Sequence, residues 1–147
     1  MIKKGIKSTI VVLLLLGIFT GLAAATSYLE PSDLMNYKST SNKDISVPYG
    51  TSTTYSCTIG STSSDVDWCK FTSNVGDHQQ LYIDADAYLN YIAGYMISPQ
   101  NQQLGRVSYM NGNSGPAYAV ATTTYLKFLN ENSRTGRYYF YLTRSAS

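Results

Sequence analysis

Apolar and polar residues alternate along much of the chain after residue 44, and period-two alternation is the pattern of half-buried β-strands. The clearest run extends over residues 81–91, where six apolar or aromatic positions share one face: Leu81, Ile83, Ala85, Ala87, Leu89 and Tyr91. This pattern predicts one strand, or two strands separated by a bend. Towards the end of the chain, residues 137–144 alternate in the same way and predict a further strand.

Shorter strands are predicted at residues 94–97, 103–110 and 118–129 from their apolar, β-branched and aromatic content. Turn residues separate these runs, namely Ser98-Pro99-Gln100-Asn101, Asn111-Gly112 and Thr135-Gly136. No sustained helical period occurs outside the first residues of the chain. The sequence therefore predicts an all-β fold, an antiparallel sandwich or barrel.

The first residues have the composition of an export signal. Lys3, Lys4 and Lys7 precede an apolar run over residues 10–22, and Ala23-Ala24-Ala25 supplies a small-residue cleavage site. We expect residues 1–25 to be a signal peptide that is cleaved before Thr26. The alternative is an uncleaved leader that anchors the protein in a membrane. Residues 26–44 are polar and predict an extended lead-in, and residues 45–147 form a single β-sandwich domain.

The charge of the mature chain argues against a nucleic-acid partner. The full chain carries 11 basic and 9 acidic residues, but three of the basic residues lie in the leader. The mature chain is therefore slightly acidic, whereas nucleic-acid binders carry a basic face. Its tyrosine content is high, with 14 tyrosines, all beyond the leader.

Cys57 and Cys69 are the two cysteines of the chain. Export places them in an oxidising compartment, where two cysteines most simply form one disulfide. A metal site or a reactive thiol is the alternative, but the single histidine, His78, offers few further ligands. We predict a structural disulfide between Cys57 and Cys69.

One segment resembles a known family. Its sequence is Asp65-Val66-Asp67-Trp68-Cys69-Lys70-Phe71-Thr72, followed by Gly76. It is similar to the Asp-x-Asp-Trp strand and glycine turn of the bacterial and archaeal pre-peptidase C-terminal domain. Residues 94–104 resemble the central strand, turn and strand of that family. Residues 135–142 resemble its closing Gly-x-Tyr strand, and residues 30–33 its usual start.

The resemblance implies a compact, non-catalytic β-sandwich of jelly-roll type in an exported protein. The positions that match the family motif are expected to be structural: Asp65, Asp67, Trp68, Phe71, Gly76, Gly136 and Tyr138. Cys69 departs from the family, which usually has an aromatic residue there, and a bond to Cys57 would replace that contact with a link between neighbouring strands. No peptidase precedes the domain in this chain, so the resemblance does not imply a role in peptidase processing.

Two sets of residues are candidates for site chemistry. His78, an aspartate and Ser114 occur in the order of some serine proteases, but the chain is too short for the double-barrel fold that uses this order, and we predict no catalysis. No cofactor is expected, although four carboxylates are candidate calcium ligands: Asp65, Asp67, Asp84 and Asp86. The alternative places Asp65 and Asp67 in hydrogen bonds at a turn, and Asp84 and Asp86 on the solvent face.

Tyrosines form two predicted outward stripes, Tyr82 with Tyr88 and Tyr139 with Tyr141. Such rings suit protein interfaces or stacking on sugars, although strand propensity alone also explains them. The sequence therefore predicts a secreted or cell-surface, non-catalytic module that binds protein or glycan. The alternative is a subunit that self-assembles into a surface layer or filament, with residues 26–44 as a donor strand that is ordered only in the homo-oligomer.

Overall fold

The computed structural model describes residues 26–29, 38–40, 43–61, 65–86, 89, 91–108, 112–131 and 134–147. The predicted signal peptide, residues 1–25, lies outside the described residues, as does Tyr88. No helix in the described part of the chain is long and apolar enough to cross a membrane.

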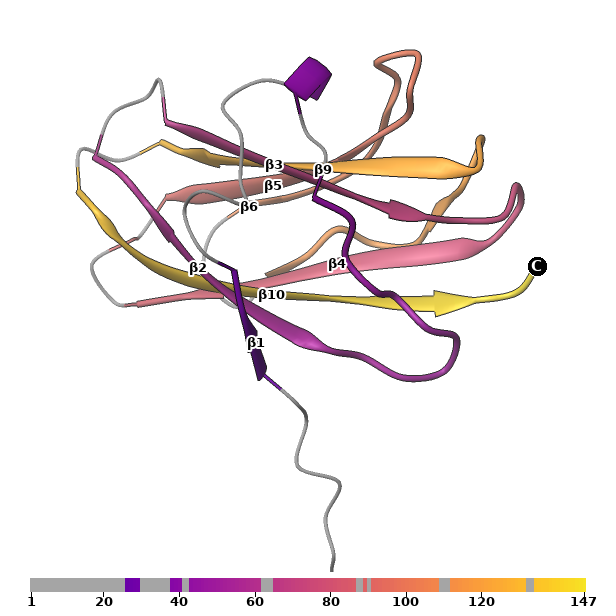
Figure 1. The fold of residues 1–147 in the computed structure, drawn as a ribbon, viewed down its shortest axis with the longest axis horizontal. Helices are drawn as coiled ribbons and strands as arrows, with labels where there is room; N and C mark the ends of the chain where they lie inside the picture. Colours follow the sequence, from indigo (N-terminus) through magenta and orange to yellow (C-terminus); the bar gives the residue numbers. More distant parts are fainter. Residues whose placement is uncertain are drawn as a thin grey trace, which may run out of the picture.

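Strands form nearly all of the regular structure (Figure 1). In chain order the elements are β1 (Thr26–Tyr28), the 3₁₀ helix η2 (Lys38–Thr40), β2 (Thr54–Ile59), β3 (Val66–Thr72), β4 (His78–Ala85), β5 (Ile92–Ile97), β6 (Gln103–Ser108), β7 (Gly112–Asn113), β8 (Ala117–Tyr118), β9 (Thr123–Asn130) and β10 (Gly136–Ser145).

The strands form two packed sheets (Figure 1). The first sheet has the order β1-β2-β10-β4-β7, with β8 also paired to β4, and the second has the order β3-β9-β5-β6. Consecutive strands β2, β3, β4 and β5 alternate between the sheets, while β10 and β9 return to lie beside β2 and β3. This nested order is that of a jelly roll. The predicted all-β, antiparallel β-sandwich is confirmed.

The core lies between the sheets because each long strand turns alternate side chains inward. In β10, Tyr138, Phe140 and Leu142 are buried, as the alternation predicted. The Phe128 ring of β9 packs from the opposite sheet against Phe140, with ring centroids 4.5 Å apart, and against Tyr138 at 4.9 Å. This aromatic cluster joins the two sheets at their centre.

Three predicted segments differ from the structure. The strand predicted over residues 81–91 ends at Ala85, and Leu89 beyond it is buried outside any strand. The strand predicted over residues 118–129 is split into β8 and β9. The lead-in contains η2, and its β1 pairs in parallel with β2 of the same chain. Residues 26–28 are thus ordered in a single chain, contrary to the donor-strand alternative, because they occupy their own sheet edge.

The predicted disulfide is not formed: Cys57 and Cys69 are both buried thiols. Cys57 lies on β2 of the first sheet and Cys69 on β3 of the second, so they are not on neighbouring strands of one sheet. Buried cysteines pack as small apolar side chains. Burial also raises the pKa of the Cys69 thiol well above its usual range, which suppresses the thiolate that disulfide exchange requires.

Candidate functional site

The outer face of the first sheet carries the predicted tyrosines. Tyr82 of β4 and Tyr141 of β10 are directly opposite each other, and their rings stack with centroids 4.4 Å apart and planes 5° apart. Tyr139 lies on the same face, opposite Asp84. The structure therefore brings together Tyr82, Tyr139 and Tyr141.

A chain of hydrogen bonds connects this tyrosine pair to the segment after β7. The Tyr82 hydroxyl donates to Gln80 Oε1 at 2.8 Å, and Gln80 Nε2 donates to Asn113 Oδ1 at 2.9 Å. The same Asn113 oxygen accepts from the Gly115 N–H at 3.0 Å. The tyrosine side chains and the loop over residues 114–118 therefore form one continuous surface.

The loop over residues 114–118 is held firmly against β4. The Ser114 N–H donates to the Leu81 carbonyl at 2.8 Å, and the Leu81 N–H donates to Ser114 Oγ at 3.0 Å. Gly115 has a φ of 69°, which a residue with a side chain adopts only with strain. Ala117 is buried and pairs with Gln79. These contacts fix the backbone on both sides of the exposed Pro116.

Tyr118 follows this braced segment and is 60% exposed. It pairs with His78 at the start of β4, and the two rings lie 4.5 Å apart at an angle of 59°. A large aromatic side chain is thus presented to solvent from a backbone position that the sheet fixes. The sequence pattern did not single out Tyr118, because Tyr118 is the first residue of the strand predicted over residues 118–129.

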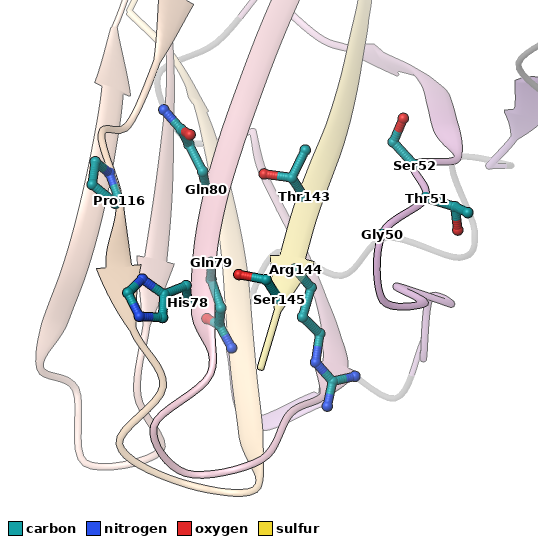
Figure 2. Close-up of a pocket in the computed structure, with 10 residues that line it drawn as sticks. All are labelled: Gly50, Thr51, Ser52, His78, Gln79, Gln80, Pro116, Thr143, Arg144 and Ser145. Carbon is teal, nitrogen blue, oxygen red and sulfur yellow. The ribbon is translucent and has the colours of Figure 1, made fainter. Parts of the chain in front are cut away.

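A cavity of about 460 Å³ opens beside this loop (Figure 2). Figure 2 shows His78 and Gln80 on β4, Pro116 on one side, and residues 50–52 on the other. The full lining is Gly50, Thr51, Ser52, His78, Gln79, Gln80, Pro116, Thr143, Arg144 and Ser145. We call this cavity, the loop over residues 114–118 and the three tyrosines the candidate binding face.

One buried ion pair holds the far wall of the cavity. Arg144 Nε donates to Asp77 Oδ2 at 2.6 Å, and the two side chains are only 11% and 4% exposed. The guanidinium also lies 4.2 Å from the Tyr49 ring centroid and donates to the Tyr49 hydroxyl at 3.0 Å. The Arg144 carbonyl accepts from the Gly50 N–H at 3.1 Å. Arg144 therefore positions the segment at residues 49–50 that leads into the cavity wall.

The environment of Asp77 keeps it ionised. Its burial favours the neutral acid, but hydrogen bonds from the Asn74 N–H, from Arg144 and from Tyr49 favour the carboxylate. The hydrogen bonds outweigh the burial and hold the pKa of Asp77 below its usual range. The ion pair is thus maintained at neutral pH.

The four candidate calcium ligands are not gathered in one place. Asp65 and Asp67 belong to the β3 side of the second sheet, whereas Asp84 and Asp86 are exposed at the end of β4 in the first sheet. Asp65 accepts the Gly60 N–H, as the alternative of a hydrogen-bonded turn predicted. No group of three potential metal ligands occurs among the residues that the structure describes.

Asp67 differs from both expectations, because it is 5% exposed and lies inside the sandwich. It accepts a hydrogen bond of 2.9 Å from the Tyr138 hydroxyl. Burial, with a smaller contribution from Asp65, raises the pKa of Asp67 to about 7, although the Tyr138 hydrogen bond opposes this. A carboxyl group that is partly neutral at pH 7 is a poor calcium ligand.

The candidate catalytic residues are also separated. His78 and Asp84 share one face of β4 but are six residues apart, which corresponds to about 20 Å along a strand. Ser114 Oγ is engaged with the Leu81 N–H and the Gly115 carbonyl. A nucleophile, base and orienting acid must contact one another, so these residues do not form a triad.

The other motif positions have structural surroundings. Phe71 is fully buried, while Trp68 is half-buried on the outer face of the second sheet. Gly76 has a φ of 92° in the turn before β4. A side chain at Gly136 would collide with Leu89.

No protein-family model matches the sequence. No curated protein matches it either. Solved structures do match the fold. A periplasmic inhibitor of g-type lysozyme, PliG from Aeromonas hydrophila, is 10% identical with a TM-score of 0.52, and the match covers 82% of this chain and 98% of the inhibitor. PliG from Salmonella Typhimurium is 17% identical with a TM-score of 0.46, covering 71% and 100% of the two chains. At these identities, the chain is similar to the Aeromonas inhibitor in its fold.

Proposed function

We propose that this chain is an exported, non-catalytic module that binds a protein partner through the candidate binding face. The observation that carries the proposal is Tyr118, an exposed aromatic side chain on a braced loop, with its ring packed against His78 of the cavity lining. Tyrosine is enriched at protein interfaces because it provides a large apolar area and a polar tip.

The rigidity of the loop supports recognition of a protein. The hydrogen bonds of Ser114 and the pairing of Ala117 order the backbone before any partner arrives. Binding then costs less conformational entropy than it would with a flexible loop. Tyr118 has the properties of an anchor residue, and the adjacent cavity has room for one or two side chains of a partner.

A glycan is less well suited to this face. Tyr82 and Tyr141 stack on each other almost in parallel, so each ring has one face covered by the other. At most one face of each ring is therefore left for a sugar. The geometry of this pair gives no specific support to the predicted stacking of sugars on these two residues.

The similarity to the Aeromonas PliG structure guides the choice of partner. Because one fold serves many functions, this is an argument by analogy. It agrees with the predicted export of the chain and with a face built for protein contact. We propose a g-type lysozyme as the partner and an extracytoplasmic compartment as the location.

Replacement of Tyr118 tests the proposal. We expect the wild-type chain to bind a g-type lysozyme, and Tyr118→Ala to weaken binding about 30-fold, because truncation of an aromatic anchor typically costs about 2 kcal/mol. Isothermal titration calorimetry measures the affinity. Tyr91→Ala is the matched control, since Tyr91 is 49% exposed and lies outside the candidate binding face.

Tyr91→Ala should bind as tightly as the wild type. The proposed location is wrong if both variants lose affinity equally. The proposed partner is wrong if the wild-type chain itself does not bind.

A further inference from the structure

The opposite side of the sandwich carries a row of alternating aromatic and cationic side chains. Trp68 on β3, Lys127 on β9, Tyr95 on β5 and Arg106 on β6 are successive cross-strand partners. Directly opposite residues of a sheet point to the same face. The four side chains therefore cross the outer face of the second sheet in one line, which we call the aromatic–cationic row.

Distances within the row show that each cation lies over a ring. Lys127 Nζ is 5.7 Å from the Trp68 ring centroid and 5.6 Å from that of Tyr95. The Arg106 guanidinium is 5.5 Å from the Tyr95 ring, and its Nε donates to the Tyr95 hydroxyl at 3.2 Å. Because strands are about 4.8 Å apart, Lys127 and Arg106 are spaced by about 10 Å across the sheet.

The positive charge of this face is only partly balanced. Arg106 pairs with Glu131 at 3.5 Å, and both side chains are well exposed, so the pair is weak. The exposed Asp44 is the backbone bridge partner of Lys70 on β3, but it makes no ion pair with Lys70. Lys127 has no acidic partner within ion-pair distance in the described part of the chain. Lys70 is diagonal to Lys127 on the same face, at about 7–8 Å between backbone positions.

This arrangement contrasts with the slightly acidic mature chain. A face with unbalanced cations on such a chain attracts an anionic partner. Trp68 and Tyr95 are half-buried, and the parts of their rings that Lys127 and Arg106 do not cover offer flat apolar surface to a partner. A linear partner with regularly spaced anionic groups and ring-shaped units would contact both kinds of side chain along the row.

We infer that the outer face of the second sheet binds an anionic polysaccharide. Sugar rings of the chain lie against Trp68 and Tyr95, and its carboxylate, sulfate or phosphate groups meet Lys127, Lys70 and Arg106. This surface is on the opposite side of the sandwich from the candidate binding face. It gives the module a second ligand, an anionic envelope or matrix polymer, that is bound independently of the protein partner.

Dextran sulfate and uncharged dextran are suitable probes because they share one glucan backbone and differ in charge. We expect the wild-type chain to bind dextran sulfate, with an affinity that falls as salt is added, and not to bind dextran at the same concentration. Lys70→Gln and Lys127→Gln should each weaken binding about threefold, and the double variant about tenfold. Microscale thermophoresis measures these affinities.

Arg137→Gln is the charge-matched control, since Arg137 is exposed on the outer face of the first sheet. It should leave binding within about twofold of the wild type. An equal loss in this control and in the lysine variants would overturn the proposal, as would the absence of dextran sulfate binding. Thermal unfolding of each variant establishes that the fold is intact.

Two further measurements distinguish binding of a polysaccharide from binding of any polyanion: one uses the variant Trp68→Leu, and the other uses an oligothymidylate as the ligand. Trp68→Leu should weaken dextran sulfate binding, because the sugar rings lose a stacking surface. Oligothymidylate of equal charge should bind at least tenfold more weakly than dextran sulfate. Equal affinity for both polyanions, or no effect of Trp68→Leu, would show that the face binds any polyanion through charge alone. Either result would contradict the proposal.

Discussion

The free energy of unfolding of this domain is expected to fall as the pH rises from about 4 to about 7, because of Asp67. Its pKa is about 7 in the folded protein, whereas an unperturbed aspartate, which represents the unfolded chain, has a pKa of 3.8. At pH values between these two pKa values, Asp67 is protonated in the folded state and ionised in the unfolded state. The contribution of Asp67 to the free energy of unfolding is therefore greatest below pH 4 and disappears as the folded carboxyl group ionises. The full difference corresponds to about 4 kcal/mol.

The groups around Asp67 explain the direction of this effect. The carboxyl group is buried between the sheets, near Asp65 and the thiol of Cys69, and neither of these neighbours is a cation. Its hydrogen bond from Tyr138 compensates only part of the cost of burying a charge. The ionised form is therefore tolerated in the fold at a substantial cost.

Asp67→Asn should remove most of this pH dependence. An amide oxygen can still accept the Tyr138 hydroxyl, and it does not ionise. At pH 8 the variant should be more stable than the wild type by a few kcal/mol. Urea denaturation at several pH values between 4 and 8 measures the difference. Asp84→Asn, at an exposed position of β4, is the control, and a profile common to wild type and both variants would refute the role of Asp67.

Arg144→Met is expected to destabilise the domain by about 3 kcal/mol. The change removes the buried partner of Asp77 and leaves that carboxylate with hydrogen bonds but no cation. It also removes the guanidinium from the Tyr49 ring and from the carbonyl groups of Val47 and Thr72. The far wall of the cavity should therefore loosen together with the loss of stability.

Arg137→Met is the matched control for this change, because Arg137 is an exposed residue of the same strand. Surface substitutions of this kind typically alter stability by less than about 0.5 kcal/mol. Equilibrium denaturation of the two variants gives the comparison. An equal effect of both would show that the buried ion pair contributes nothing specific.

The fold was predictable because its core follows the simplest rule of strand structure. In β10 the inward positions Tyr138, Phe140 and Leu142 are large and apolar, and the outward ones are polar or tyrosine. The same alternation continues from Phe71 back through Cys69 to Asp67 and places all three inside. The burial of Asp67 was thus indicated by the sequence, although its polar character favoured a turn.

The candidate binding face was only partly predictable. Period-two alternation placed Tyr82, Tyr139 and Tyr141 outward, but it carries no information on which residues face each other across strands. The stacking of Tyr82 on Tyr141 and the contact of His78 with Tyr118 depend on that register. A count of cysteines likewise gives no distance between the sulfurs of Cys57 and Cys69, and the predicted disulfide is not formed. The resemblance to the pre-peptidase C-terminal domain stays a prediction.

Hydrogen–deuterium exchange of the chain, with and without a g-type lysozyme, tests whether the protein partner binds at the candidate binding face. We expect slower exchange of the loop over residues 114–118 and of residues 50–52 when the partner is bound. We expect unchanged exchange at β3, the edge strand of the second sheet that lies away from this loop. Protection confined to the second sheet, or no protection anywhere, would contradict the assignment of the candidate binding face.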